Sequence, residues 1–273
     1  MKIVGVIQAR VGSTRLPGKV LLPLLGRPVL ERMLVRVSRA TSLDEIVVAT
    51  TRLATDDGIR AVSRALGVRC ISGHPVDLLD RHRHAAEVTG ADAVVKIPSD
   101  CPLIDPAVID ETVGFFRANH PVYQFVGNLQ PPTWPDGNDV EVFTRGLLEE
   151  AWREAERPFQ REHTTPFMWD QPERYRVRNV RWSSGLDLSA SHRLTLDYVE
   201  DYRLISAVFE ALHKSDGRAF TVEEIVAYLD THPEVKALNA ARLGSSWMDK
   251  HAAELRTWRR PVIDESHTVE ATP

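Results

Sequence analysis

The sequence predicts an α/β protein with a mostly parallel central sheet. Through the first half of the 273 residues, short apolar segments alternate with longer segments that have helical patterns. Such alternation is typical of strands joined by right-handed helical crossovers. The first apolar segment, residues 2–7, is rich in Ile and Val, as expected for a strand buried on both faces. In such a sheet, a ligand binds at the carboxyl ends of the strands.

Four strands and four helices are expected in the first half of the chain. The strands are predicted at residues 2–7, 45–51, 68–72 and 93–98, and the helices at residues 29–39, 56–66, 77–90 and 106–119. Proline is tolerated at a helix start, so Pro28 and Pro106 are compatible with helices that begin there. Asp56 and Asp57 can cap the second helix, and Gly67 is suited to end it.

The second half of the chain is less regular. Residues 129–138 are rich in proline and turn residues and are expected to form an excursion over the site, outside the sheet. Strands are predicted at residues 139–143, 175–180 and 194–196, and helices at residues 147–156, from about 199, and at 220–230. Thr221 followed by Glu224 predicts a capping box at the start of the last helix.

Composition excludes several classes of function. The 38 acidic residues slightly outnumber the 34 basic ones, so no basic excess indicates a nucleic-acid partner. No run of 18 apolar residues predicts a membrane span, and the N-terminus lacks a signal-peptide pattern. Cys70 and Cys101 lie far apart with no Cys-x-x-Cys, which suits a reducing cytoplasm and excludes a cysteine-rich zinc site.

The loop that follows the first strand has the chemistry of a phosphate cradle. Residues 8–19 hold two glycines, one proline, two hydroxyl side chains and three cations, Arg10, Arg15 and Lys19. Glycines let the backbone approach a ligand closely, and N–H groups in such a turn favour anions. Arginine and lysine supply the countercharge. The alternative is a solvated loop whose charges have no special role.

Two familiar phosphate-binding motifs are excluded by spacing. A P-loop has four residues between its glycines and Ser or Thr after the lysine. Here five residues separate Gly12 from Gly18, and Val20 follows Lys19. A third glycine that would complete the dinucleotide-binding fingerprint is also absent from this loop.

Residues 7–19, Ile-Gln-Ala-Arg-Val-Gly-Ser-Thr-Arg-Leu-Pro-Gly-Lys, resemble the opening of the cytidylyltransferases that make CMP-activated sugar acids. The closest resemblance is to the spore-coat-polysaccharide branch, with the 3-deoxy-manno-octulosonate (Kdo) and acylneuraminate cytidylyltransferases as more distant relatives. Further matches extend to about residue 215. The resemblance implies a three-layer αβα, Rossmann-like nucleotidyltransferase fold of the GT-A-like type.

The same resemblance assigns the loop to the triphosphate of CTP. The residues that it places at the nucleotide are Gln8, Ala9, Arg10, Gly12, Ser13, Arg15, Lys19, Ser99 and Asp100. In the mechanism that follows from these parts, Arg10, Arg15 and Lys19 stabilise the transition state and the leaving pyrophosphate, and Asp100 holds the metal. Electrostatic positioning is expected to dominate such a transfer.

Two aspartates are predicted to hold Mg²⁺. Asp100 lies just past the strand at residues 93–98, where the family's metal aspartate occurs. Asp197, in a segment that resembles the family's Leu-Thr-x-Asp-x-x-Glu-Asp pattern, is the second metal carboxylate by resemblance. Carboxylates holding Mg²⁺ offset the charge of a triphosphate. Asp105 and Asp201 are instead expected to cap helices. The alternative for Asp100 is a turn residue.

The acceptor is expected to contact two segments. Asp139 and Glu141 alternate with valines, so both should face one side of their strand, beside the sugar-acid pocket by resemblance. Arg161 and His163, in a segment similar to the family's Arg-Glu-His-x-Thr-Pro signature, could reach an acceptor carboxylate or phosphate. The alternatives are a polar outer face of an edge strand for the first pair and subunit packing for the second.

The domain organisation predicted from these features has three parts. Residues 1–230 form the nucleotidyltransferase domain, in which residues 128–182 are an insertion on the acceptor side that also serves dimerisation. Residues 231–259 form a helical extension, and residues 260–273 a disordered tail. The resemblance implies a homodimer.

The sequence therefore predicts a cytoplasmic enzyme that transfers CMP from CTP to a Kdo-like or nonulosonate-like sugar acid and releases pyrophosphate. An acceptor outside the sugars, such as a phosphonate, stays open. A glycosyltransferase would carry an Asp-x-Asp motif after a central strand, where this chain has Ser99-Asp100-Cys101. A non-catalytic binding protein is disfavoured because Arg10, Lys19 and both aspartates are retained.

Overall fold

The structure is a computed structural model that describes residues 1–214 and 218–257. A seven-stranded sheet forms its centre, in the spatial order β5-β4-β1-β6-β8-β7-β9. The strands are β1 (Ile3–Gln8), β4 (Glu45–Thr51), β5 (Arg69–Gly73), β6 (Ala93–Pro98), β7 (Phe125–Gly127), β8 (Glu141–Thr144) and β9 (Val177–Asn179). β1 pairs in parallel with β4 and β6, β4 with β5, and β7 with β9, whereas β8 is antiparallel to β6 and β7.

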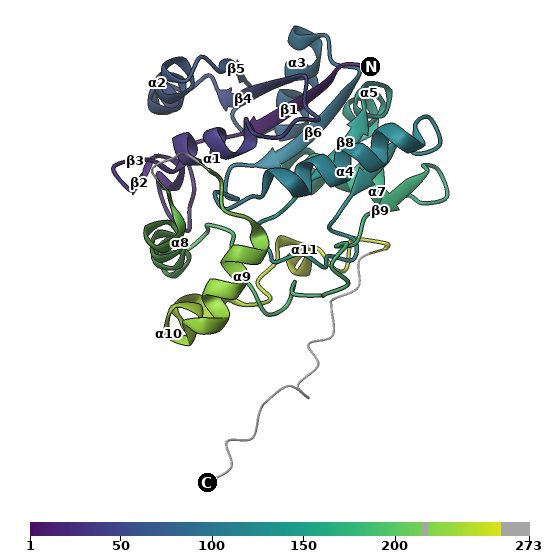
Figure 1. The fold of residues 1–273 in the computed structure, drawn as a ribbon. Helices are drawn as coiled ribbons and strands as arrows, with labels where there is room; N and C mark the ends of the chain where they lie inside the picture. Colours follow the sequence, from purple (N-terminus) through teal and green to yellow (C-terminus); the bar gives the residue numbers. More distant parts are fainter. Residues whose placement is uncertain (215–217, 258–273) are drawn as a thin grey trace.

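Helices cover both faces of the sheet, so the predicted three-layer αβα fold is confirmed (Figure 1). Alternate residues of β1 explain the layers: Ile3 and Ile7 pack with one set of helices, and Val4 and Val6 with the other. The first set comprises α1 (Val29–Val37), α2 (Asp57–Ala65) and α4 (Pro106–Asn119). The second comprises α3 (Leu78–Thr89), α5 (Arg145–Glu154) and α7 (Pro166–Trp169).

A third apolar cluster joins the C-terminal helices to the loops beside the sheet. α8 (Val199–Leu212) and α9 (Val222–Thr231) bury Phe209 and Ile225 in this cluster, together with Leu24, Leu103 and Leu194. Leu24 belongs to a small antiparallel pair of β2 (Pro23–Leu24) and β3 (Arg27–Pro28). The cluster holds the segment around residue 197 against the carboxyl ends of β1 and β6.

Two helix starts confirm predicted caps, and at a third the predicted cap is not formed. Asp105 accepts a hydrogen bond from Ala107 N at the start of α4, and Thr221 and Glu224 form the capping box of α9. Asp56 stands at the N-cap position of α2 but makes no capping bond. Its buried carboxylate instead accepts bonds from Val11 N (2.8 Å) and from the Thr51 hydroxyl, so it fixes the loop after β1.

The predicted strand at residues 194–196 is not formed. The backbones of Arg193 and Asp136 form one isolated β-bridge, in which Leu194 N donates to Asp136 O (2.6 Å). Leu196 N donates to Asp100 O (2.7 Å). The backbone of this segment therefore forms hydrogen bonds with two loops, the ones that carry Asp100 and Asp136. It does not pair with a strand of the described sheet. Strand β7, three residues long, was not predicted.

The chain after α9 turns back onto the domain. It contains α10 (Pro233–Lys236), the 3-10 helix η3 (Ala237–Arg242) and α11 (Trp247–Lys250), drawn in yellow-green and yellow in Figure 1. The division into a main domain, an insertion at residues 128–182 and an extension at 231–259 stays a prediction. The tail expected at residues 260–273 lies outside the described residues.

Shorter elements complete the description. These are the 3-10 helices η1 (Lys19–Leu21) and η2 (Ala54–Asp56) and the helix α6 (Pro158–His163). Cys70 and Cys101 are both free thiols. Among the described helices, none has the length and apolar character that a membrane crossing requires.

Candidate active site

The loop after β1 is folded tightly over the sheet edge. Ser13 N and Gly18 N both donate to Val11 O (2.8 and 3.1 Å), and Leu16 N donates to the Ser13 hydroxyl (3.3 Å). Gly18 has φ +69°, a conformation that glycine adopts without strain. This turn directs the next residue, Lys19, inward at the start of η1.

Lys19 brings the two predicted metal carboxylates together. Its Nζ donates to Asp100 Oδ2 (3.0 Å), Asp197 Oδ1 (2.9 Å) and Leu196 O (2.7 Å). Burial alone would lower the pKa of Lys19, but the attraction of the two carboxylates outweighs it and the pKa is raised. Residues that lie 178 positions apart in the chain thus form one ionic cluster in which the ammonium stays charged.

Two arginines complete the cluster around Asp197. Arg15 Nη2 donates to Asp197 Oδ1 (2.5 Å), and Arg193 Nη2 to Asp197 Oδ2 (3.3 Å). Arg193 is almost fully buried and also pairs with Asp136 (3.0 Å) and Asp201 (2.9 Å). Asp201 accepts bonds from the backbone at the start of α8, as predicted for a cap. Sequence reasoning assigned no role to Arg193 or Asp136, because their partners meet only in the fold.

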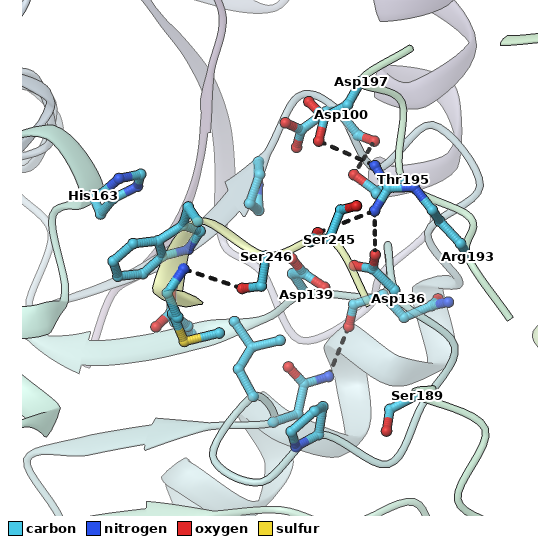
Figure 2. A pocket seen from close by; sticks show the side chains of 18 of the residues that line it. Asp100, Asp136, Asp139, His163, Ser189, Arg193, Thr195, Asp197, Ser245 and Ser246 are labelled. Carbon is cyan, nitrogen blue, oxygen red and sulfur yellow. Dashed lines mark hydrogen bonds and ion pairs between the residues drawn. The ribbon is translucent and has the colours of Figure 1, made fainter. Parts of the chain in front are cut away.

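A cavity of about 290 Å³ opens beside this cluster. Figure 2 shows Asp100, Asp197 and Arg193 on one side of it and His163 on the other, with Ser245 and Ser246 between. Gln8, Arg15 and Asp139 also line the cavity, whereas Arg10, Gly12, Ser13 and Lys19 do not. The loop predicted to hold the triphosphate therefore borders the cavity without filling it.

Acidic groups dominate the lining of the cavity. Its seven carboxylates are Asp100, Asp136, Asp139, Glu141, Glu162, Asp197 and Asp249, and its three cations are Arg15, Lys96 and Arg193. Burial raises the pKa of Asp139 to about 8, and the charges of Asp136 and Asp100 add to this. Burial likewise raises the pKa of Asp136 to about 6, although Arg193 opposes it. The site therefore has a surplus of negative charge.

The four residues predicted to hold the acceptor lie in different surroundings. Asp139 lines the cavity. Glu141 lines it too, but its carboxylate already pairs with Lys96 and accepts a bond from the Thr165 hydroxyl (2.8 Å). Arg161 is not among the residues that line the cavity: its guanidinium pairs with Asp77 (2.6 Å) at the start of α3, and its contact with an acceptor stays a prediction.

His163 lines the cavity but is not a cationic anchor. Its ring stacks on the indole of Trp247, with the ring centroids 3.7 Å apart and the planes 12° apart. Burial lowers the pKa of His163 to about 3, and the charge of Lys96 adds to the effect. A neutral imidazole cannot neutralise an acceptor carboxylate, but it can still form a hydrogen bond, so acceptor contact through His163 stays a prediction.

The remaining predicted nucleotide residues lie around the loop. Ala9 and Ser99 are buried beneath it, and Arg10 Nη1 donates to Pro75 O (3.4 Å). The residues that sequence reasoning missed include Ser245 to Asp249 on the C-terminal segment. The family resemblance fades before that segment, so no motif there could indicate a site.

Asp100 and Asp197 fit a divalent cation. Their carboxylates already converge on one cation, the ammonium of Lys19, and both face the cavity. Over the described residues, no group of three or more His, Cys, Asp or Glu side chains is arranged to hold a metal ion. Two carboxylates suit Mg²⁺, which usually binds one or two of them and takes its remaining ligands from substrate phosphates and water.

A cationic loop after β1, a carboxylate after β6 and a second carboxylate held against them lie where α/β proteins bind ligands, and this combination suits nucleotidyl transfer. The sequence model of the family described as cytidylyltransferase matches residues 4–204. Spore coat polysaccharide biosynthesis protein SpsF of Bacillus subtilis is 30% identical over 85% of this chain and 95% of its own length. The chain therefore belongs to the cytidylyltransferase family and is a CTP-dependent nucleotidyltransferase, as predicted.

A solved structure agrees with this membership. A cytidylyltransferase from Leptospira borgpetersenii serovar Hardjo-bovis superposes with a TM-score of 0.81 and 31% identity, covering 86% of this chain and 96% of that one. The 3-deoxy-manno-octulosonate cytidylyltransferase of Geobacter sulfurreducens is 37% identical over 44% of this chain and 47% of its own length. The likeness to that Kdo enzyme is thus confined to about half of each protein.

Proposed function

We propose that the enzyme transfers CMP from CTP to a sugar acid of the Kdo or nonulosonate class, with release of pyrophosphate, in the synthesis of a surface polysaccharide or glycoconjugate. The partial match to a Kdo cytidylyltransferase supports this substrate class, and the longer match to SpsF supports a role in polysaccharide synthesis. The observation on which the proposal rests is the placement of Lys19, Asp100 and Asp197 between the loop and the cavity.

Two parts of the site would bind the two substrates. The loop at residues 8–19 would hold the triphosphate through its N–H groups and through Arg10 and Arg15, while the cavity would hold the acceptor. A hydroxyl of the acceptor attacks the α-phosphate in line, its oxygen–phosphorus bond forms, and the bond to the β-phosphate oxygen breaks. Lys19 and Arg15 face the charge that develops on the transferring group and the leaving pyrophosphate.

Mg²⁺ is the proposed cofactor. When bound, it would neutralise charge on the phosphate oxygens and orient the triphosphate. Asp100 and Asp197 are the residues that would hold it. Asp139 lines the cavity and accepts a hydrogen bond from Gly137 N (3.3 Å), and its carboxyl group is the one that we assign to acceptor hydroxyls.

The experiment that tests the function measures pyrophosphate release from each nucleoside triphosphate, with Mg²⁺ or with EDTA, across a panel of sugar acids and phosphonates. We expect CTP and one sugar acid to give turnover that EDTA abolishes. Lys19→Ala and Asp100→Asn should each lower turnover at least ~10²-fold, the scale for removing one preorganised electrostatic group.

A charge-matched control for the lysine variant is Lys250→Ala, which removes an exposed cation on α11. It should retain wild-type turnover. Near-normal activity of Lys19→Ala or Asp100→Asn would refute the assigned roles. Pyrophosphate release with phosphonates but with no sugar acid would show that the acceptor is a phosphonate.

We also propose that the enzyme acts in the cytoplasm as a homodimer. Two free thiols suit a reducing compartment, and the family resemblance supports a dimer. Light scattering on the purified chain should give twice the 30.7 kDa of one protomer, and a mass near one chain would contradict the dimer.

A further inference from the structure

The C-terminal segment forms one wall of the cavity. Residues 244–249, which include the start of α11, all line it. They lie well beyond residue 204, where the match to the family ends. This wall is therefore a feature of this chain that membership of the family does not imply.

The segment is held firmly in place from the inner side. Asn239, almost fully buried, donates from Nδ2 to Arg193 O and to Asp201 Oδ1 (both 2.9 Å). Arg193 Nη1 donates to Ser245 O (3.4 Å) as well as to Asp136. The guanidinium of Arg193, which pairs with the carboxylates of the site, thus also holds the C-terminal wall of the cavity in position.

The segment is anchored on its outer side too. Asp170 accepts bonds from Arg256 N (2.9 Å) and Thr257 N (2.7 Å), and Arg157 donates to Glu254 O (2.9 Å). Met248 and Leu255 are buried in the apolar cluster on one face of the sheet. Because both ends are bonded and the middle is packed, the segment is a fixed wall of the cavity.

The aromatic part of this wall is the Trp247 indole, stacked face to face on His163. Both residues line the cavity and both are only half-buried. The hydroxyl-bearing side chains of Ser245 and Ser246 lie beside them, and Figure 2 shows these serines between His163 and the Arg193 cluster. An apolar ring face next to hydroxyls matches a sugar ring, which has an apolar C–H face and hydroxyl edges.

We propose that Trp247 is a specificity-determining residue for the acceptor, its indole forming the surface on which the acceptor ring packs, with Ser245 and Ser246 beside it for acceptor hydroxyls. This inference rests on the proposed function and deepens it by placing the acceptor end of the cavity. His163, whose ring stacks on the indole, is a positioning residue.

The test compares Trp247→Ala, Trp247→Phe and the control Lys250→Ala in steady-state pyrophosphate release, with CTP and Kdo varied separately. If Kdo is not a substrate, the sugar acid that the wild type uses best takes its place. Loss of the aromatic surface should raise the acceptor KM about tenfold or more, the scale for losing a packed aromatic contact. The KM for CTP should stay unchanged, and Trp247→Phe should restore most of the acceptor affinity.

Several outcomes would overturn the inference. An acceptor KM that is the same in Trp247→Ala and the wild type would do so. An equal rise in both KM values, with a lowered melting temperature, would assign Trp247 to structure alone. A rise in the acceptor KM of Lys250→Ala as large as that of Trp247→Ala would show that the effect is not specific to the indole. If the wild type releases pyrophosphate with no acceptor of the panel, the proposed function itself fails, and this inference fails with it.

Discussion

At the scale of single residues, Lys19 connects the chemistry of the site to the stability of the fold. The ammonium lies between two carboxylates and a carbonyl, all within 3.0 Å. Removing one partner of a buried ionic cluster is strongly destabilising, because the remaining charges lose their compensation. A divalent cation at the same carboxylates would supply that compensation.

This reasoning predicts the behaviour of Lys19→Met. In EDTA, the free energy of unfolding should fall by about 3 kcal/mol, and Mg²⁺ should restore part of the loss because it takes the place of the ammonium charge. Urea unfolding with EDTA and with Mg²⁺ measures both effects, and the exposed Lys250→Met is the control. If the free energy of unfolding of the variant is the same with EDTA and with Mg²⁺, the result would argue against a metal at Asp100 and Asp197.

His82 gives a prediction about pH. Its ring is fully buried in α3, with Nδ1 hydrogen-bonded to Leu78 O (2.9 Å), and Nε2 has no hydrogen-bond partner in the part of the chain that the structure describes. Burial lowers the pKa of His82 to about 3, whereas an unfolded histidine titrates near 6.5. Between these values the unfolded chain binds the extra proton, so this histidine destabilises the fold as the pH falls.

In His82→Phe this contribution is absent. The stability difference between the wild type and the variant should therefore shift in favour of the variant by about 2 kcal/mol when the pH falls from 7.5 to 5. Urea unfolding at both pH values measures the shift. Curves for the two proteins that run parallel across this range would show that His82 is not held neutral in the fold.

At the scale of elements, Gly137 shows how closely two loops approach at the site. It has φ +104°, and a Cβ there would lie 2.6 Å from both Leu194 C and Thr195 N. Both contacts are with backbone, which cannot yield as a flexible side chain can. The excursion at residues 129–138 is therefore packed directly against the segment that carries Asp197.

We expect Gly137→Ala to destabilise the protein more than Gly67→Ala. Gly67 also has a positive φ, +68°, but a Cβ there would meet nothing within 4 Å. Gly67→Ala should cost about 1–2 kcal/mol from backbone conformation alone, and the clash adds to that at Gly137. Urea unfolding of the two variants decides the matter, and equal losses would contradict the close approach.

Elements with strong periodicity could be predicted from the sequence, and those that depend on distant partners could not. Strands β4 and β6 and helix α4 have the predicted limits, because their apolar patterns and end signals are local. Residues 194–196 are apolar enough for a strand, yet they bond to two loops whose position only the fold determines. β7 is too short for its pattern to be recognised.

The same distinction applies to the site. Residues Arg15, Lys19, Asp100 and Asp197 follow strand ends or lie in a recognisable motif, and the structure brings them together. Arg161 belongs to such a motif as well, but its guanidinium pairs with Asp77, and Arg161 is not among the residues that line the cavity. Trp247 could not be found from the sequence, because its partner His163 lies 84 residues away in an unrelated segment.

At the scale of the whole molecule, ligand binding should be visible as stability. We expect CTP with Mg²⁺ to bind the folded chain and not the unfolded one, so at about 100 times Kd it should add about 2.7 kcal/mol to the free energy of unfolding. A chain of this size should then melt about 5–10 °C higher. In Asp100→Asn the part of the shift that depends on Mg²⁺ should disappear.

A thermal-shift assay with CTP, with Mg²⁺, and with both measures this linkage without requiring an acceptor. Asp57→Asn changes an exposed carboxylate at the start of α2 and serves as the matched control. If the melting temperature of Asp100→Asn still rises with Mg²⁺ as it does in the wild type, the metal must be bound by other residues.

The ionic cluster around Lys19 has a consequence for the order in which a ribosome completes the protein. Lys19 and Arg15 emerge early, but Asp197 follows about 180 residues later, and Ser245 later still. A nascent chain interrupted before residue 197 therefore has the loop at residues 8–19 but lacks the second carboxylate. The contacts around Arg193 are therefore complete only after residue 245 has been translated, when the backbone of Ser245 can meet the guanidinium that also pairs with Asp136 and Asp197.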